Sequence, residues 1–280
     1  MNKIYGVIGD PIAHSMSPDI HNDAFEKENI ESVYHHFHVK PESLLEAVQG
    51  MKALGVAGFN ITIPHKTTVI PLLDEVDELA LAIGAVNTVI NENGRFIGDN
   101  TDGIGFYKSL CDEISGDIMA KKTLVIGAGG AARAIYFTLV KEGVTHVDIA
   151  NRTMETAAHL VSDCPYDKES KALTIAEAEE SLSQYDLIIQ TTSSGMSPHI
   201  EHSPLKLDQL KADAFVSDII YNPLQTKLLR EAREKGAETQ NGVGMFVYQG
   251  ALAFEIWTGI MPNTARMTDI VSNKLGGNTC

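Results

Sequence analysis

Cysteine is scarce in this chain, and its scarcity argues against a fold held together by disulfides or zinc. The 280 residues include three cysteines, Cys111, Cys164 and Cys280, which are scattered and have no paired metal spacing. A disulfide framework needs an even set of cysteines, and a structural zinc site needs ligands a few residues apart. We therefore expect neither, and we predict a reducing, cytoplasmic setting.

Long hydrophobic runs are also absent. A membrane-spanning helix needs about 20 consecutive apolar residues, and no stretch of this chain approaches that length. The start, Met1-Asn2-Lys3, leads into a predicted strand rather than a signal peptide. With 44% hydrophobic residues, a chain of 280 residues can form two domains that each bury a core.

Basic residues are outnumbered: 22 Lys and Arg stand against 37 Asp and Glu, for a net charge of −15. Such a balance disfavours binding to nucleic acid or to an anionic membrane. Any anionic ligand must be held by local donors. A metal site is not expected either. His35, His36 and His38 are close in the sequence, but only His36 and His38 share a strand face.

Glycine is concentrated in Lys121–Ala134, where an apolar strand leads into a glycine turn and a helix. Gly127, Gly129 and Ala132 occupy the three small positions of the G-x-G-x-x-G/A dinucleotide pattern. Gly127 permits the tight turn, Gly129 lets backbone approach a pyrophosphate, and Ala132 allows close helix packing. The helix offers free N–H groups and its positive dipole end to the phosphates.

The second strand of this region ends in Asn151-Arg152-Thr153. An NAD site usually has Asp or Glu there to accept from the ribose 2′-hydroxyl, whereas a guanidinium pairs with a 2′-phosphate. Asp148 lies inside the strand and is expected to face away from the cofactor. The tip therefore favours NADP over NAD.

Strands and helices alternate from Thr123 onward, which predicts a doubly wound parallel sheet in an NADP-binding Rossmann-type domain over residues 104–244. The N-terminal α/β substrate domain is predicted to comprise residues 1–103 and to be completed by C-terminal helices within 245–280. The strands of the NADP-binding domain are predicted at Thr123–Ile126, His146–Ala150, Ala172–Ile175, Asp186–Thr191, Phe215–Ile219 and near Glu238. Other elements are predicted at Lys3–Ile8, Ser32–Val39, Pro41–Leu54, Asp74–Ala82, Val86–Asn91, Arg95–Gly98, Met245–Thr258 and Thr264–Leu275.

Ser15 and Ser17 precede a predicted helix that has Pro18 at its first position. Two explanations stay open for the serines. Ser17 can simply cap the helix, which leaves Ser15 without a role. Alternatively, both hydroxyls and the helix N–H groups can form a corner that binds a carboxylate.

The predicted strand Val56–Ile63 leads into Pro64-His65-Lys66. Alternation places Asn60 and Thr62 on one face, which suits a ligand site better than a core. Lys66 is predicted at a helix start, where the dipole disfavours a positive charge, so it is either incidental or functional. The polar run Gly98–Gly103 follows a strand, and its simplest interpretation is a loop in which Asp102 caps the next helix, Ile104–Ile114. Because that helix is expected to bridge to the nucleotide domain, the loop is also expected at the cleft between the domains, where ligands bind.

Together these segments resemble the shikimate dehydrogenase family along essentially the whole chain. The resemblance rests on eight motifs: Ser15-Met16-Ser17-Pro18, Asn60-Ile61-Thr62-Ile63-Pro64-His65-Lys66, Gly84-Ala85-Val86-Asn87-Thr88, Gly98-Asp99-Asn100-Thr101-Asp102-Gly103, Gly127-Ala128-Gly129-Gly130-Ala131, Asn151-Arg152-Thr153, Asp218-Ile219-Ile220-Tyr221-Asn222-Pro223 and Gly244-Met245-Phe246-Val247-Tyr248-Gln249. It implies reversible, NADPH-dependent reduction of 3-dehydroshikimate to shikimate, on the pathway to chorismate and the aromatic amino acids.

The resemblance also implies roles for individual residues. The substrate carboxylate is assigned to Ser15, Ser17 and Tyr221, and the ring hydroxyls to Thr62, Lys66, Asn87, Asp102 and Gln249. The pyrophosphate is assigned to Gly127, Ala128, Gly129, Gly130 and Ala131, the 2′-phosphate to Asn151, Arg152 and Thr153, and the cofactor border to Glu78, Ile219 and Gly242.

Lys66 and Asp102 are the predicted catalytic residues, because hydride transfer to a carbonyl needs a proton donor at the same oxygen. We assign the acid–base role to Lys66 and an orienting role to Asp102, although the residues alone leave the two roles exchangeable. Four positions depart from the family pattern, namely Thr156, Gln190, Phe246 and Gly250. Thr156 replaces a frequent basic residue, so the 2′-phosphate would depend largely on Arg152.

Two other functions remain open from the sequence: a quinate/shikimate dehydrogenase that uses NAD, and a non-catalytic NADP-binding sensor. Binding alone does not require both Lys66 and Asp102, which disfavours the sensor. The partner is expected to be a small-molecule substrate, with no nucleic acid and no membrane. Either a monomer or a homodimer is compatible with the sequence.

Overall fold

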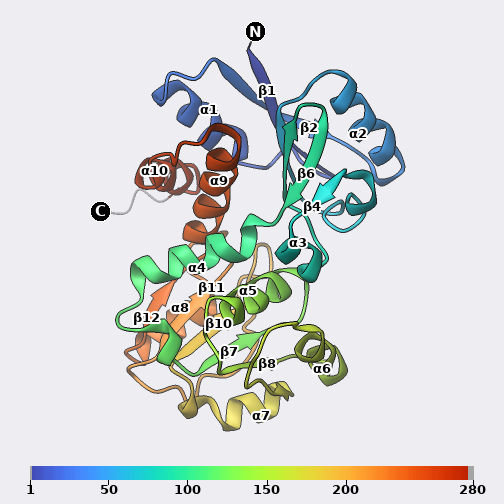
Figure 1. The fold of residues 1–280 in the computed structure, drawn as a ribbon. Coiled ribbons are helices and arrows are strands. Elements are labelled where there is room, and N and C mark those ends of the chain that lie inside the picture. The colour runs from blue at the N-terminus through green and yellow to red at the C-terminus, as the bar shows by residue number, and fades with distance from the viewer. Residues whose placement is uncertain (1, 277–280) are drawn as a thin grey trace. The chain divides into compact units, whose positions relative to one another are not determined.

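A computed structural model describes residues 2–276 of the chain; the terminal residues 1 and 277–280, which belong to the predicted substrate domain, lie outside this range. The chain divides into two compact units. The first comprises Met1–Gly105 and Val247–Asn273, and the second comprises Phe106–Phe246 and Lys274–Cys280. Both are α/β in composition, so the predicted fold class is confirmed (Figure 1).

The first unit is built on a mixed sheet with the strand order β2-β1-β3-β5-β6-β4. Strands β1, β2 and β3 are parallel, β5 is antiparallel to both β3 and β6, and β4 runs parallel to β6. Its elements are β1 (Lys3–Gly9), α1 (Ser17–Lys27), β2 (Ser32–His38), η1 (Pro41–Ser43), α2 (Leu44–Ala53), β3 (Gly58–Ile61), η2 (Ile70–Leu72), β4 (Glu75–Val76), α3 (Glu78–Ile83), β5 (Thr88–Glu92), β6 (Arg95–Asp99) and α10 (Thr264–Lys274). Two further helices, α4 (Thr101–Glu113) and α9 (Val243–Thr258), begin in one unit and end in the other.

Helices cover both faces of this first sheet. On one face α1 and α9 enclose an aromatic cluster, in which the Trp257 ring lies 5.0 Å from the Tyr5 ring. The Trp257 Nε1–H donates to the Val89 carbonyl at 3.0 Å, which fixes α9 against the sheet. On the other face α2 and α3 pack on a hydrophobic cluster that includes Phe59 and Val48. The sheet is therefore buried on both sides, as an α/β unit requires.

One predicted helix of this unit begins later in the structure than expected. The helix expected at Asp74–Ala82 begins only at Glu78, because the Asp77 carboxylate accepts from the Leu79 N–H at 2.8 Å and so caps it there. The residues before the cap form β4, which pairs with β6. The Asn93-Gly94 turn between β5 and β6 is confirmed: both residues have positive φ, 54° and 87°.

The second unit is a doubly wound sheet, as predicted. All of its strand pairs are parallel, and the order is β12-β11-β10-β7-β8-β9 (Figure 1). Its elements are η3 (Ile118–Ala120), β7 (Thr123–Ile126), α5 (Gly130–Lys141), β8 (Val147–Ala150), α6 (Met154–Asp163), β9 (Ala172–Leu173), α7 (Ile175–Glu180), η4 (Leu182–Gln184), β10 (Leu187–Gln190), β11 (Phe215–Asp218), α8 (Lys227–Glu234) and β12 (Glu238–Gln240). The predicted strands are each present, and the differences at their ends are one or two residues.

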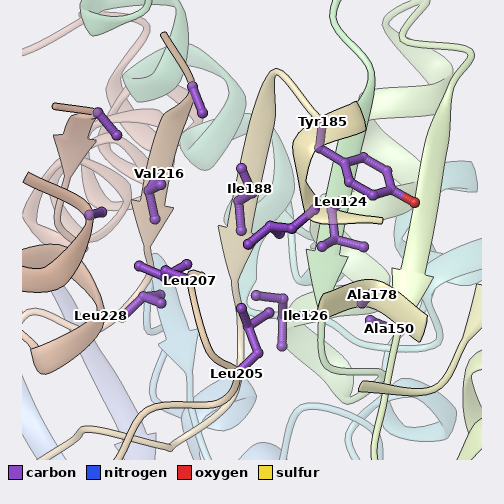
Figure 2. Packing of buried hydrophobic residues seen from close by; sticks show 14 of the residues in the cluster. Leu124, Ile126, Ala150, Ala178, Tyr185, Ile188, Leu205, Leu207, Val216 and Leu228 are labelled. Atoms are coloured by element: carbon purple, nitrogen blue, oxygen red, sulfur yellow. The ribbon is translucent and has the colours of Figure 1, made fainter. Parts of the chain in front are cut away.

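Figure 2 shows the core that holds one face of the second sheet. Leu124, Ile188 and Val216 are register neighbours on β7, β10 and β11, and they form a row of buried aliphatic side chains. Leu228 from α8 and Tyr185, which follows η4, pack onto this row. The three central strands thus form a rigid base, whose carboxyl ends carry the turns described below. Among residues 2–276 no helix is long and apolar enough to cross a membrane.

Candidate active site

Lys66 and Asp102 form an ion pair in the first unit. The Lys66 Nζ lies 2.5 Å from the Asp102 Oδ2, and the two side chains are 29% and 16% exposed. Such partial exposure leaves room for a ligand while excluding most solvent. The geometry therefore brings together the two residues that were predicted to be catalytic.

Lys66 lies in an irregular turn, and no helix starts there as predicted. The turn is held by tertiary contacts: the Val86 N–H donates to the Lys66 carbonyl at 2.8 Å. The buried His65 donates from Nε2 to the Val39 carbonyl at 2.6 Å. Because the turn is anchored on both sides of Lys66, the lysine is presented from a fixed backbone, and the expected dipole argument does not apply to it.

Asp102 was predicted to cap the helix, but Asn100 does so instead. The Asn100 Oδ1 accepts from the Asp102 N–H at 3.0 Å, and α4 begins at Thr101. Asp102 is consequently in the first turn of α4, where the helix dipole favours a carboxylate. Its side chain is free to turn toward Lys66, while Asn87 donates from Nδ2 to the other carboxylate oxygen at 2.8 Å.

The predicted residue Gln249 on α9 is tied to the same region. Thr101 donates its hydroxyl proton to the Gln249 carbonyl at 3.0 Å. Gly105 on α4 lies against the Gln249 backbone, since a Cβ at Gly105 would come within 2.6 Å of the Gln249 nitrogen. The structure thus groups Lys66, Asn87 and Asp102 directly, and it places Gln249 one contact away.

Ser15 and Ser17 lie together at the start of α1. The Ser15 hydroxyl donates to the Ser17 Oγ at 3.1 Å and accepts from the Ser17 N–H at 3.3 Å. Met16 occupies the cap position and makes no side-chain cap bond. Simple capping by Ser17 is therefore wrong, because Ser17 is already the first helical residue. The two hydroxyls lie side by side, as the alternative explanation requires, and the binding of a carboxylate there stays a prediction.

Thr62 and Asn60 do not share the environment that alternation predicted. Thr62 is half-buried, and its N–H donates to the Ile8 carbonyl at 3.0 Å. Asn60 is 5% exposed, and its Oδ1 accepts from the Tyr34 hydroxyl at 2.8 Å. The expected ligand-facing role of Asn60 is wrong, because α1 and α9 cover that face of the sheet.

The glycine turn of the second unit connects β7 to α5. Gly127 has φ +111°, and a Cβ there would come within 2.6 Å of the Thr191 Oγ1, so only glycine fits. Around Gly129 and Gly130 a Cβ would meet nothing within 4 Å. The segment Gly127–Ala131 thus comprises the turn and the first two residues of α5, a helix of 12 residues, with open space around Gly129 and Gly130. The turn lies between β7 and β10, where the strand order reverses, which is the place where open α/β sheets bind ligands.

A pocket of about 510 Å³ extends from this turn. None of its described lining residues is acidic, which is notable in a chain of net charge −15. Asn151, Arg152 and Thr153 line it together, and Arg152 is exposed. The other lining residues are Ile126, Gly127, Ile175, Thr192, Ser193, Ser194, His199, His202, Ser203 and Pro204. A guanidinium in such a pocket fits a phosphate better than a free hydroxyl.

Asp148, the acid that would signal NAD, is held elsewhere. Its Oδ2 accepts from the Tyr185 hydroxyl at 2.8 Å, and its Oδ1 accepts from the Lys171 N–H at 2.8 Å. The side chain is 6% exposed. The expectation that Asp148 faces away from the cofactor pocket is therefore confirmed.

Ile219 and Gly242 meet at the ends of β11 and β12. A Cβ at Gly242 would lie 2.0 Å from the Ile219 carbonyl oxygen, so the two backbones are in direct contact. Tyr221 follows on the same segment, and burial raises its pKa, which keeps it a hydrogen-bond donor at neutral pH. Glu78 is the exposed first residue of α3 in the first unit.

Asp218 is the last residue of β11, and its pKa reflects the burial of this segment. Burial raises the pKa of Asp218 to about 6, although hydrogen bonds from the Ile220 N–H and the Thr226 hydroxyl oppose the increase. The unfolded value is near 3.9, so the folded protein binds more protons than the unfolded chain between these two values. The resulting stability is fully present below about pH 4 and is lost as the pH rises through about 6.

We therefore expect Asp218→Asn to remove this dependence. Between about pH 4 and pH 7 the free energy of unfolding of the wild type should fall by about 2–3 kcal/mol relative to the variant. Urea denaturation of both proteins across this range measures the difference, since the other titrating groups are common to both. Parallel curves would show that Asp218 is ionised and well solvated in the folded protein.

Three family models match the chain. One described as the shikimate dehydrogenase substrate binding domain matches residues 7–89, and one described as shikimate / quinate 5-dehydrogenase matches residues 109–221. A third, the shikimate 5′-dehydrogenase C-terminal domain, matches residues 242–271. The chain belongs to the shikimate dehydrogenase family.

Individual members of the family are similar over nearly their whole length. A shikimate dehydrogenase (NADP(+)) of Bacillus cereus (strain AH187) is 56% identical over 277 residues, 99% of this chain and 100% of that protein. The solved shikimate 5-dehydrogenase of Thermus thermophilus, in complex with NADP(H) and shikimate, has a TM-score of 0.87 at 34% identity and covers 97% of this chain and 99% of its own. That of Listeria monocytogenes, in complex with shikimate and NAD, has a TM-score of 0.92 at 35% identity and covers 96% of each chain.

The family models divide the candidate site between them. Ser15, Ser17, Lys66 and Asn87 fall in the substrate binding model, and Arg152 falls in the dehydrogenase model. His65, Asn100 and Thr101 stand inside two of the family motifs, but no role was predicted for them from the sequence. His199 and His202, which line the pocket of the second unit, lie outside the motifs, and no local pattern indicated them. Among residues 2–276 no group of three His, Cys, Asp or Glu side chains is arranged to hold a metal ion.

Proposed function

We propose that this protein is an NADP-dependent oxidoreductase that interconverts 3-dehydroshikimate and shikimate. Family membership and the relative named shikimate dehydrogenase (NADP(+)) support this activity. The observation that carries the proposal for this chain is the half-buried pair of Lys66 and Asp102, at 2.5 Å. A protein that only bound NADP would have no need of such a pair.

Lys66 is the proton donor in the direction of reduction. Its ammonium group gives a proton to the substrate oxygen as the carbonyl becomes an alcohol, and it regains that proton in the reverse direction. Asp102 orients the ammonium group and compensates its charge. Asn87, which donates to the second oxygen of Asp102 at 2.8 Å, keeps the carboxylate facing Lys66.

The second unit holds the cofactor. Gly127–Ala131 and the start of α5 would bind the pyrophosphate, with Ile219, Gly242 and Glu78 along its border. Asn151, Arg152 and Thr153 would bind the adenosine 2′-phosphate in the acid-free pocket. The nicotinamide of the bound cofactor supplies the hydride.

The first unit binds the substrate. The corner of Ser15 and Ser17 would hold the carboxylate, with Tyr221 as a further donor. Thr62, Lys66, Asn87, Asp102 and Gln249 would bind the ring hydroxyls. Accordingly we assign residues 1–103 and 245–280 to substrate binding and residues 104–244 to NADP binding.

The setting of the enzyme follows from simpler features. Cys111 and Cys164 are both free thiols in the described part of the chain, which supports a reducing cytoplasm. The acidic net charge supports a small-molecule partner and disfavours nucleic acid or anionic lipid. The enzyme acts as a monomer or a homodimer.

The decisive experiment is a spectrophotometric assay at 340 nm with four combinations, shikimate or quinate with NADP+ or NAD+. We expect the highest kcat/KM for shikimate with NADP+. A preference for quinate and NAD+ would instead assign the quinate activity. Tight NADP+ binding by calorimetry without turnover of either substrate would assign a sensor.

A further inference from the structure

A buried chain of hydrogen bonds runs from the aromatic cluster of the first unit to the carboxylate that pairs with Lys66. Its members are Tyr34, Asn60, Thr88, Asn87 and Asp102. The first four side chains come from residues that are at most 5% exposed. Buried polar groups that are all paired specify one arrangement of a core, so this chain has consequences for the site at its end.

The direction of each hydrogen bond can be followed from Tyr34. The Tyr34 hydroxyl donates to the Asn60 Oδ1 at 2.8 Å, so the Asn60 amide must point its Nδ2 the other way. That Nδ2 donates to the Thr88 Oγ1 at 3.0 Å and to the Asn87 carbonyl at 3.1 Å. Reversal of the Asn60 amide would set its oxygen against the Asn87 carbonyl, which is unfavourable.

The remaining steps fix Asn87 and then Asp102. Because Thr88 accepts from Asn60, its one hydroxyl proton is available for the Asn87 Oδ1, at 3.0 Å. The Asn87 Oδ1 also accepts from the Thr101 N–H at 2.8 Å. With its oxygen held by two donors, the Asn87 amide directs its Nδ2 to the Asp102 Oδ1 at 2.8 Å. The carboxylate is therefore linked through Asn87 to every earlier member, and each of them adds to the preference for this one orientation.

Tyr34 itself is rigidly held at the start of the chain. Its ring stacks on His21 with centroids 4.4 Å apart, and burial lowers the pKa of His21 to about 3, so that ring is neutral. Asn22 binds both the N–H and the carbonyl of Tyr34, at 2.8 and 3.0 Å. Burial raises the pKa of Tyr34 well above its usual range, although the Ser17 side chain opposes this, and the hydroxyl stays a donor.

We propose that Tyr34 is a positioning residue, whose hydroxyl orients Asp102 toward Lys66 through Asn60, Thr88 and Asn87. The inference rests on the proposed function, because it assigns Tyr34 a part in the proton transfer of that reaction. Tyr34 contacts neither member of the ion pair. It acts by selecting one orientation of two buried amides, on which the acid–base geometry depends.

Tyr34→Phe tests this inference, because the variant keeps the ring and removes only the hydroxyl. We expect kcat for shikimate oxidation to fall by roughly 2- to 13-fold, the factor that corresponds to the net contribution of one hydrogen bond. KM for NADP+ should stay within about twofold. Tyr5→Phe is the matched control: Tyr5 belongs to the same aromatic cluster, 5.1 Å from Phe25, and lies outside the hydrogen-bond chain. Its kcat should remain within about twofold of the wild type.

Two additions make the test specific. The loss in Tyr34→Phe should largely disappear in an Asn87→Ala background, whereas a general packing defect would be additive there. Thr88→Val breaks the same chain nearer the site and is expected to show the same loss of kcat. It replaces Tyr34→Phe in the test if that variant does not fold. Wild-type kcat in a folded Tyr34→Phe protein, or an equal loss in Tyr5→Phe, would overturn the inference.

A readout without turnover separates this inference from the proposed function. The Asn87 side-chain amide resonance, identified by its absence in Asn87→Ala, should shift in Tyr34→Phe and not in Tyr5→Phe. If the resonance shifts in Tyr34→Phe while the wild-type protein does not oxidise shikimate, the proposed function is refuted and the hydrogen-bond chain is supported. An unshifted amide resonance would refute the chain whatever the enzyme turns over.

Discussion

Lys66→Ala is expected to lower kcat for shikimate oxidation by about 10²–10⁴-fold, the usual contribution of a positioned acid–base group. The free energy of unfolding should fall by no more than about 3 kcal/mol, the upper value for a hydrogen bond to a charged group, so the variant should still fold. Asp102 would still have the Asn87 donor and the dipole of α4 to compensate it. Initial rates at 340 nm and urea denaturation of the same preparation measure both quantities.

Lys52→Ala is the matched control for this experiment. Lys52 also pairs with an aspartate of the first unit, Asp74, at 2.7 Å, but this pair lies on the surface. Removal of an exposed pair costs at most about 1 kcal/mol, and kcat should remain within about twofold. Turnover by Lys66→Ala within a few-fold of the wild type would exclude Lys66 as the proton donor.

Asp102→Asn should also be severely impaired, because the neutral amide neither orients nor compensates the ammonium group as a carboxylate does. The double variant with Lys66→Ala should lose less than the product of the two single losses, since residues that act as a unit are not additive. This comparison distinguishes a cooperating pair from two independent contributions. Losses that multiply would show that the ion pair in the structure is not the working unit.

Arg152→Ala is expected to weaken NADP+ binding by about 1.5–3 kcal/mol, or roughly 10- to 150-fold in Kd. The reason is the loss of the guanidinium from a pocket that contains no acidic residue in its described lining. NAD+ lacks the 2′-phosphate, so its Kd should change by less than about twofold. Calorimetric titration of each cofactor into the wild type and the variant provides the four values.

Arg233→Ala serves as the control for charge. Arg233 belongs to the same unit but lies at the end of α8, where its Nε donates to the Thr239 hydroxyl at 2.6 Å. It should leave both cofactor affinities unchanged, because it is not part of the pocket. If Arg152→Ala weakens NADP+ and NAD+ equally, Arg152 does not bind the 2′-phosphate, and the pocket needs another explanation.

Features that depend on local geometry could be predicted well from the sequence. Gly127 was placed at a turn that only glycine can make, and its φ of +111° agrees. The Asn93-Gly94 hairpin turn and the order of strands and helices in the second unit were predicted for the same reason. In each case the signal is contained in a few neighbouring residues and does not depend on distant contacts.

The turn around Lys66 could not be predicted in this way. Pro64 after an apolar strand is typical of a helix start, but contacts with Val86 and Val39 hold the segment in an irregular conformation. Asn60 was misplaced because alternation gives the face of a strand and not what covers that face. The pairing of Lys66 with Asp102 came from the resemblance to a family, since no spacing rule relates residues 36 positions apart.

The aromatic cluster of the first unit has a consequence for how the protein is made. Phe254 and Trp257 of α9 cover Tyr5 and Phe25 of the N-terminal segment. In the sequence these two residues of α9 come after residues 106–246, which make up nearly all of the second unit. On the ribosome the N-terminal sheet therefore emerges with one face bare, while residues 106–246 are synthesised and fold. Truncated chains that end before Trp257 would leave this apolar face of the sheet exposed. We expect such chains to be bound by chaperones or degraded by proteases rather than to persist as folded substrate domains.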